Sequence, residues 1–177
     1  MIRTMMISLV TAAAVVAFIP ATGAHSAEQE AKPFTQAFLK NAAEMCQAEM
    51  ALGQLAADRG TNKRVRQFGA DIVTAHKRIH QEVQDWAAMK GVQLPSEVSG
   101  EHKQKLKELS SLSGHAFDRE YMQYILRDQQ NEVNEFEEAM ETVEDAAVLR
   151  WTHRTLPMLR AHVEEARGIK YSLQTAN

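Results

Sequence analysis

The sequence is poor in the residues that support small disulfide-bonded or turn-rich folds. Among its 177 residues there are one cysteine, four prolines and eight glycines. One thiol cannot form a disulfide within the chain, so we interpret Cys46 as a small buried apolar residue, with an intermolecular disulfide as the alternative. Few prolines and glycines mean few turns, which favours long helices over a sandwich of short strands.

An excess of positive charge is also missing. The chain has 20 lysines and arginines against 23 aspartates and glutamates, which gives a formal net charge of -3 at pH 7. Proteins that bind nucleic acids usually present a basic surface to the phosphate backbone. We therefore expect no nucleic acid as a partner.

Long apolar runs are absent except at the N-terminus. Arg3 precedes a mostly apolar run up to Ile19, and a series of small residues follows. This order is typical of a secretory signal peptide, and the run is shorter than the roughly 20 apolar residues of a transmembrane helix. We expect residues 1–27 to be a signal peptide cleaved within residues 23–27, with an uncleaved anchor as the alternative. Residues 28–177 are then one periplasmic domain, and we expect no transmembrane segment in this mature chain.

Apolar residues recur at spacings of three and four along most of the remaining chain, which is the pattern of helices with one buried face. The pattern predicts long helices over about 33–60, 62–91, 115–143 and 145–173, and a shorter one around 106–112. Four long helices with short connections form an antiparallel four-helix bundle. We therefore predict an all-α fold, a four-helix bundle with one short extra helix.

The last of these long helices contains Pro157. A proline inside a helix removes one backbone donor and clashes with the preceding turn. We predict a kink or a break at this point, with Thr155 as the cap of a restarted second half.

Each of the four apolar stripes is interrupted by a polar residue. These residues are Glu49, His76, Gln129 and His162. Counted from the turns that join the helices, they lie at similar heights in an antiparallel bundle. Burying one polar group without a partner costs roughly 1–3 kcal/mol, so we expect the four to satisfy one another directly, through water or through a metal ion.

Three kinds of polar centre fit this pattern. The preferred interpretation is a structural layer held by hydrogen bonds. The first alternative is a single zinc or iron ion held by Glu49, His76 and His162, because carboxylates and imidazoles are ligands of both metals. The second alternative is a redox dimetal site, although the Glu-x-x-His motif of ferritin-like diiron sites does not occur in this sequence.

Four segments carry a resemblance to a known family. AEMALGQLA, FGADIVTAH, LSGHAFDREYM and TLPMLRAHVEEA resemble successive signatures of the domain-of-unknown-function 4142 family, whose members are ferritin-like proteins exported by bacteria. The resemblance covers about residues 34–173 and implies a ferritin-like bundle without an established reaction. The family commonly has His where this chain has Gln129, which is a poor transition-metal ligand. The family pattern picks out Glu49, His76, Asp118, Tyr121 and His162, and so adds Asp118 and Tyr121 to the central polar layer.

These observations favour a binding protein over an enzyme. The sequence shows no nucleophile paired with a base and no glycine loop that could hold a phosphate. The preferred function is an exported periplasmic bundle that binds or buffers, or that acts in a stress response. A ferritin-like metal oxidoreductase using Glu49, His76 and His162 is one alternative. An envelope interaction module is the other, and a second copy of the chain or an envelope protein is the kind of partner we expect.

Overall fold

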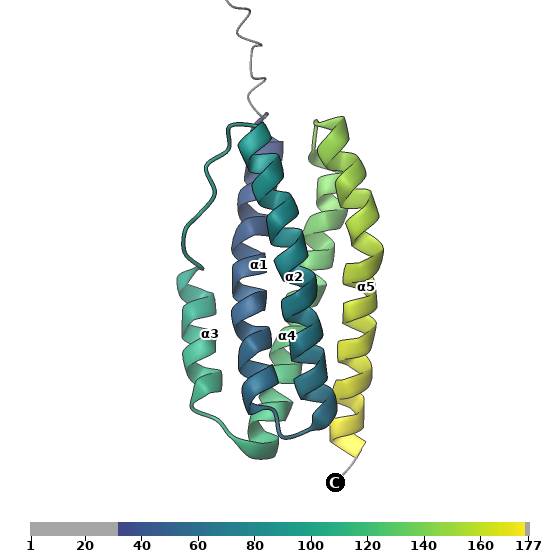
Figure 1. Ribbon diagram of the computed structural model, residues 1–177. Coiled ribbons are helices and arrows are strands. Elements are labelled where there is room, and N and C mark those ends of the chain that lie inside the picture. Colours follow the sequence, from purple (N-terminus) through teal and green to yellow (C-terminus); the bar gives the residue numbers. More distant parts are fainter. Residues whose placement is uncertain (1–31, 176–177) are drawn as a thin grey trace, which may run out of the picture.

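Five α-helices make up the fold, and the computed structural model describes residues 32–175 (Figure 1). The predicted signal peptide, residues 1–27, lies outside the described residues. No strand occurs between residues 32 and 175, so the predicted all-α four-helix bundle with one short extra helix is confirmed. The helices are α1 (Pro33–Arg59), α2 (Lys63–Met89), α3 (Gly100–Ser110), α4 (Gly114–Thr142) and α5 (Ala146–Thr175).

Two antiparallel hairpins, α1–α2 and α4–α5, build the bundle. Short polar residues start the second helix of each hairpin by accepting a hydrogen bond from its first turn. Asn62 Oδ1 accepts from the backbone N–H of Arg64 at 2.8 Å, and Asp145 Oδ1 accepts from that of Ala147 at 2.9 Å. These caps fix where α2 and α5 begin, and so fix the heights at which their polar residues lie.

A pair of glycines brings α1 and α2 unusually close together. A Cβ atom built on Gly53 would lie 2.7 Å from the backbone oxygen of Gly69, and one built on Gly69 would lie 2.5 Å from the oxygen of Gly53. No side chain fits at such distances. The α1–α2 interface is therefore closed by direct backbone contact at this level.

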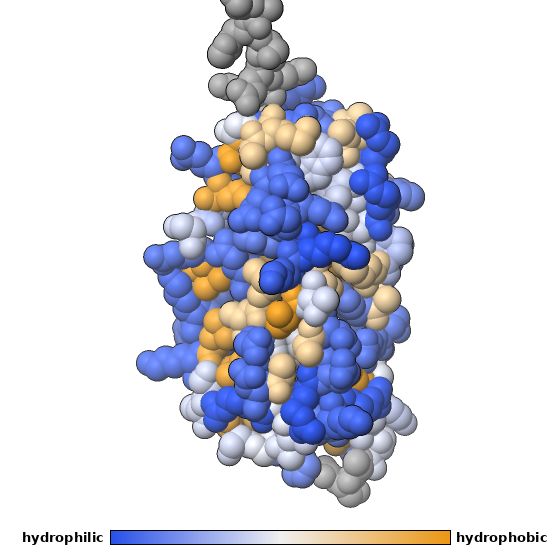
Figure 2. Space-filling view, in the orientation of Figure 1, coloured by the Kyte–Doolittle hydropathy of each residue, from blue (hydrophilic) through white to orange (hydrophobic). Residues whose placement is uncertain are grey.

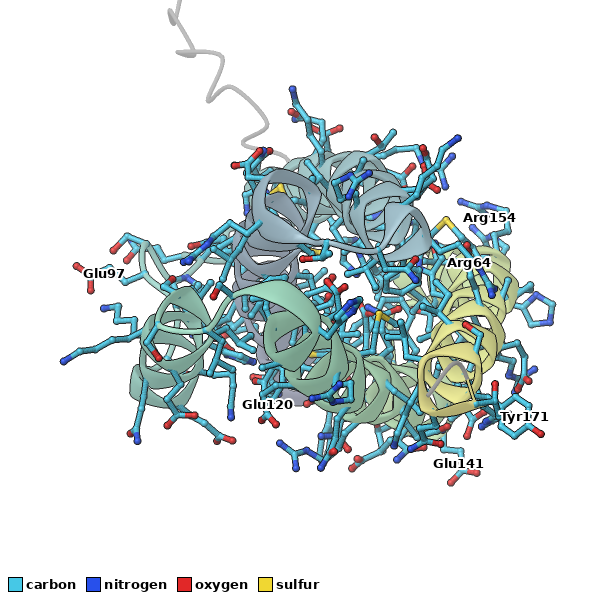
Figure 3. All side chains as sticks on the ribbon, turned by 90° about the horizontal axis from the view of Figure 1, so that it is seen from below. Arg64, Glu97, Glu120, Glu141, Arg154 and Tyr171 are labelled. Carbon is cyan, nitrogen blue, oxygen red and sulfur yellow. The ribbon has the colours of Figure 1, made fainter. Side chains whose placement is uncertain are left out.

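The short helix α3 stands outside the ring of four long helices, next to α1 and α4 (Figure 3). Leu109 is its one buried residue. His102 ties α3 to the bundle, because its Nδ1 lies 2.8 Å from Glu44 Oε1 on α1 and its Nε2 lies 3.6 Å from Asp128 Oδ1 on α4. The α1–α4 side of the bundle is thus covered by an additional element.

The apolar core is divided into two clusters along the bundle axis. One cluster includes Phe38, Phe136 and Trp151, whose rings contact one another. The other includes Phe68 and Phe117. On α1, α2 and α4 the predicted polar residues Glu49, His76 and Gln129 fall between the segments that supply the two clusters, whereas on α5 His162 is followed by Val163 of the first cluster. The polar residues therefore form a layer that separates two dry cores.

Of the two outcomes predicted at Pro157, the break is wrong, since α5 continues through the proline from Ala146 to Thr175, and a kink stays a prediction. Thr155 does not cap a second helix either, because its Oγ1 donates to the backbone oxygen of Trp151 at 3.0 Å within the same helix. Pro157 is exposed, while Leu156 and Leu159 beside it are buried. Core contacts on both sides of the proline hold the helix together although one backbone donor is missing.

The surface over α1, α2 and α5 is mainly hydrophilic, and apolar side chains show only in small separate areas (Figure 2). Labelled side chains such as Glu97, Glu141 and Tyr171 point away from the bundle (Figure 3). Within the part of the chain that is described, no helix has the length and hydropathy required to cross a bilayer.

Candidate metal centre

Four polar side chains from three helices are buried at the level between the two apolar clusters. Glu49 on α1 is 1% exposed, and His76 on α2 and Gln129 on α4 are fully buried. Glu132, also on α4, is fully buried beside them. We call Glu49, His76 and Glu132 the central cluster.

His76 is held in one orientation by a hydrogen bond at each ring nitrogen. Its Nδ1 lies 3.0 Å from the backbone oxygen of Ile72, one turn earlier on α2. A carbonyl oxygen can only accept, so Nδ1 carries a proton and donates it. Its Nε2 lies 3.1 Å from Glu132 Oε2. This arrangement, with Nδ1–H fixed by the backbone and Nε2 directed at a carboxylate, is the one by which proteins orient a histidine for metal binding.

The central cluster has the spacing of a metal site. One nitrogen of His76 and one carboxylate oxygen each from Glu49 and Glu132 all lie within 4.8 Å of one another. Ligands that bind one zinc ion at about 2.0–2.2 Å are at most about 4.4 Å apart. Small rotations of the two carboxylates would therefore bring all three atoms onto a single ion.

Several buried polar atoms around this point have no hydrogen-bond partner among residues 32–175. They include both carboxylate oxygens of Glu49 and Oε1 of Glu132. The amide of Gln129 reaches the cluster, with its Nε2 3.4 Å from Glu132 Oε2. Burial raises the pKa of Glu49 more than this amide lowers it, and neither Glu49 oxygen has a partner within hydrogen-bond geometry in the described chain. A buried polar atom without a partner costs roughly 1–3 kcal/mol. Ionised carboxylate oxygens only accept, so a cation at this point would satisfy Glu49 and Glu132 together.

Burial changes the acid–base properties of the cluster. It raises the pKa of the Glu49 carboxyl well above its usual range. For His76, burial alone would lower the pKa, but Glu132 and Glu49 outweigh burial and raise the pKa to about 9. His76 is therefore protonated at pH 7 and donates to Glu132 from Nε2. A metal ion that binds at Nε2 must displace this proton.

His162 lies beside the central cluster rather than within it. It is half-buried on α5, and its ring centroid is 6.0 Å from that of His76. Burial and the neighbouring His76 lower its pKa to about 4, so the imidazole is uncharged at neutral pH. Its Nδ1 is buried without a hydrogen-bond partner among the described residues. The third member of the cluster is therefore Glu132 and not His162, which the sequence pattern predicted.

Asp118 does not belong to the central layer, so its predicted position is wrong. Its two carboxylate oxygens accept hydrogen bonds from the backbone N–H groups of Thr61 at 2.9 Å and Asn62 at 2.7 Å. Asp118 thus fastens the α1–α2 turn to α4 at the end of the bundle. Turn residues expose free N–H groups, and a carboxylate from a neighbouring helix satisfies them.

Tyr121 lies on the side of the layer that faces the second apolar cluster. It is fully buried and its ring stacks on Phe117, with ring centroids 5.9 Å apart. Burial, followed by the charges of Glu49 and Asp128, raises the pKa of its hydroxyl. That hydroxyl has no hydrogen-bond partner among residues 32–175. Tyr121 therefore borders the central cluster and offers a polar atom on its edge.

Glu132 is the residue that the sequence reasoning missed. The last part of α4 is rich in glutamates, and most of them are exposed. Glu132 differs from them because it lies three residues after Gln129, and residues at this spacing share one face of a helix. The position of Gln129 in the apolar stripe was therefore a signal for Glu132.

Comparisons with known proteins extend this description. A crystal structure of a DUF305 fragment from Deinococcus radiodurans is similar in fold, with a TM-score of 0.72 and 16% sequence identity over 81% of this chain and 99% of that chain. No curated protein matches the sequence. Residues 20–169 match the family described as Domain of unknown function (DUF4142). The chain therefore belongs to the DUF4142 family, as the sequence resemblance predicted.

Proposed function

We propose that this protein binds a single divalent transition-metal ion in the central cluster. Glu49, His76 and Glu132 are the ligands, one from each of α1, α2 and α4. The observation that carries the proposal is the coincidence of two properties at one place. Three ligand atoms lie within 4.8 Å of one another, and in the part of the chain that is described both oxygens of Glu49 and Oε1 of Glu132 lack hydrogen-bond partners.

The ligand types narrow the choice of ion. Imidazole nitrogen favours zinc and iron over calcium and magnesium, whereas carboxylate oxygen disfavours soft ions such as Cu(I). Cys46 is the one thiol of the chain, and it is not in the group of ligands. Zn²⁺ and Fe²⁺ are therefore the ions that this mixed site fits best.

The depth of the site favours a bound ion that is stored or structural over one that reacts with a substrate. The three ligands are at most 1% exposed, and a substrate needs an open position next to a catalytic metal. We infer a binding or buffering role for an exported protein, with the export itself resting on the N-terminal sequence.

A hydrogen-bonded layer without metal is the second candidate, because His76 and Glu132 already pair at 3.1 Å. It accounts for two of the three residues of the cluster. Glu49 is left over, since both of its oxygens lack a partner within residues 32–175. Metal binding accounts for all three residues and is the better explanation.

The test is a metal titration of the mature chain, purified without a histidine tag. Zn²⁺, and Fe²⁺ under anaerobic conditions, should bind with one ion per chain and raise the melting temperature. Glu49→Gln and Glu132→Gln should weaken binding at least tenfold, as loss of a ligand does. Glu141→Gln is the matched control, because Glu141 is exposed on the same helix as Glu132. Equal binding by wild type and Glu49→Gln would contradict the proposal.

A further inference from the structure

The interface between α2 and α5 is the least covered approach to the central cluster. α1 packs closely on α2, and α4 on α5. The α1–α4 side carries α3 on its outer face. By contrast, α2 and α5 contact each other at few points, and no further helix of the described chain lies over them (Figure 1).

A surface groove of about 380 Å³ follows this α2–α5 interface. Its walls combine charged, aromatic and sulfur-containing side chains, among them Arg78, Glu82, Trp86, Trp151, Arg154 and Met158. The Arg154 side chain extends outward from α5 (Figure 3). We call this groove the α2–α5 seam.

His162 lies on α5 beyond the last residue that lines the seam, Met158. It follows Met158 by four residues on α5, which is about one helical turn, and its ring is 6.0 Å from that of His76. The residue is half-buried, so part of it remains accessible to solvent. Its Nδ1 is buried without a hydrogen-bond partner in the described chain. The imidazole therefore lies next to His76 and about one helical turn from the wall of the groove.

Arg78 crosses the seam at Met158, about one helical turn from His162 on α5. Its guanidinium Nη2 lies 3.0 Å from Met158 Sδ, so the side chain reaches from α2 to α5. Glu82 and Asp85 line the same groove, so a cation in it meets acidic groups as well as Arg78. The positive charge of Arg78 opposes the passage of a cation.

We propose that metal ions enter and leave the central cluster through the α2–α5 seam, with His162 as the transfer ligand and Arg78 as a barrier. This inference rests on the proposed metal-binding function. His162 Nδ1, which has no hydrogen-bond partner in the described chain, binds an ion that has passed Arg78. The ion then moves to His76 and the two carboxylates. Because a transfer ligand acts in both directions, its loss slows entry and exit by the same factor and leaves the equilibrium affinity unchanged.

Exchange kinetics of Co²⁺ test the inference, since Co²⁺ accepts the same ligands and absorbs visible light. Association is followed by stopped-flow absorbance, and dissociation by transfer of Co²⁺ to excess EDTA. His162→Gln keeps a neutral side chain of similar reach but removes the imidazole. Arg78→Met keeps the aliphatic stem but removes the charge. His153→Gln and Arg150→Met are the matched controls, because His153 and Arg150 are exposed on α5 and neither lines the seam.

His162→Gln should lower both rate constants about tenfold with an unchanged Kd. Arg78→Met should raise both about fivefold, the effect of one charge near the surface. The two controls should behave as wild type. Unchanged rates in His162→Gln would overturn the inference. So would a weaker Kd that comes only from faster dissociation, because His162 would then be a resident ligand.

Two further outcomes separate this inference from the proposed function. If His102→Gln, which loosens α3, accelerates exchange while Arg78→Met does not, ions enter on the α1–α4 side. The route would then be wrong and the metal site would stand. If wild type binds no Co²⁺, both proposals fail together. Circular dichroism and the unfolding midpoint of each variant show whether its fold is intact.

Discussion

The imidazole of His76 on α2 and the carboxylate of Glu132 on α4 lie 3.1 Å apart, and both side chains are excluded from solvent. Their contact joins the two hairpins of the bundle at its centre. A buried charge that loses its partner is strongly destabilising, whereas an apolar pair of similar size is often tolerated.

The first prediction follows from this pair. His76→Leu and Glu132→Leu should each lower the free energy of unfolding of the metal-free protein by about 3 kcal/mol, because each change leaves one buried polar group unpaired. The double variant should lose less than the sum of the two single changes. Urea unfolding of all four proteins in EDTA measures the coupling. Strictly additive losses would show that the two side chains do not interact.

The second prediction concerns the contact of α1 with α2. Gly53→Ala should destabilise the protein by about 1–3 kcal/mol, since the added Cβ would lie 2.7 Å from the backbone oxygen of Gly69 and overpacking has this cost. Gly168→Ala is the control. Gly168 also lies within a helix, but its nearest neighbour would be 4.0 Å away, at Arg64 Nη2.

Gly168→Ala should stabilise the protein by about 0.5–1 kcal/mol, the difference in helix propensity between alanine and glycine. Thermal unfolding of both variants measures the contrast. Equal effects of the two substitutions would mean that α1 and α2 do not approach each other as closely as Gly53 and Gly69 indicate.

The sequence predicted the helices well because apolar periodicity and turn residues report local structure directly. It also placed Glu49, His76 and Gln129 in the core, since each interrupts an apolar stripe. It could not identify the pairing of His76 with Glu132, because contacts between α2 and α4 depend on how the helices are rotated about their axes. Asp118 illustrates the same difficulty. Its partners are backbone groups of a distant turn, and such partners leave no trace in side-chain patterns.

The third prediction concerns pH and the attachment of α3. Hydrogen bonding to Asp128 and Glu44 outweighs burial and raises the pKa of His102 to about 9. A folded-state pKa above the unfolded value of about 6.5 means that the protonated form stabilises the fold. This stability is complete below about pH 6.5 and is lost as the pH rises through 9. The contribution should be below about 1 kcal/mol, because the cluster is partly accessible to solvent.

His76, whose pKa is also raised to about 9, contributes in the same pH window, so the His102 part must be isolated with a variant. His102→Gln should reduce the loss of stability between pH 6.5 and 9.5 without abolishing it. His115→Gln is the control, because His115 is exposed. Amide exchange in α3 should accelerate with pH in wild type but change little in His102→Gln beyond the intrinsic effect. An identical pH response in the two proteins would contradict the role of His102.

The last prediction opposes stability to metal binding at Glu49. Its carboxyl is 1% exposed and has no hydrogen-bond partner among residues 32–175, so in the metal-free protein it is a cost to the fold. Glu49→Leu removes an unsatisfied buried group of similar volume and should raise the stability of the metal-free protein by about 1 kcal/mol. The same change removes a ligand, so Zn²⁺ should no longer raise the melting temperature. Residues kept for function commonly carry such a cost.

Melting curves of wild type and Glu49→Leu, in EDTA and in excess Zn²⁺, should therefore cross, with the variant more stable without metal and the wild type more stable with it. If Glu49→Leu is less stable in EDTA, the carboxyl has a structural partner and the polar layer supports the fold by itself.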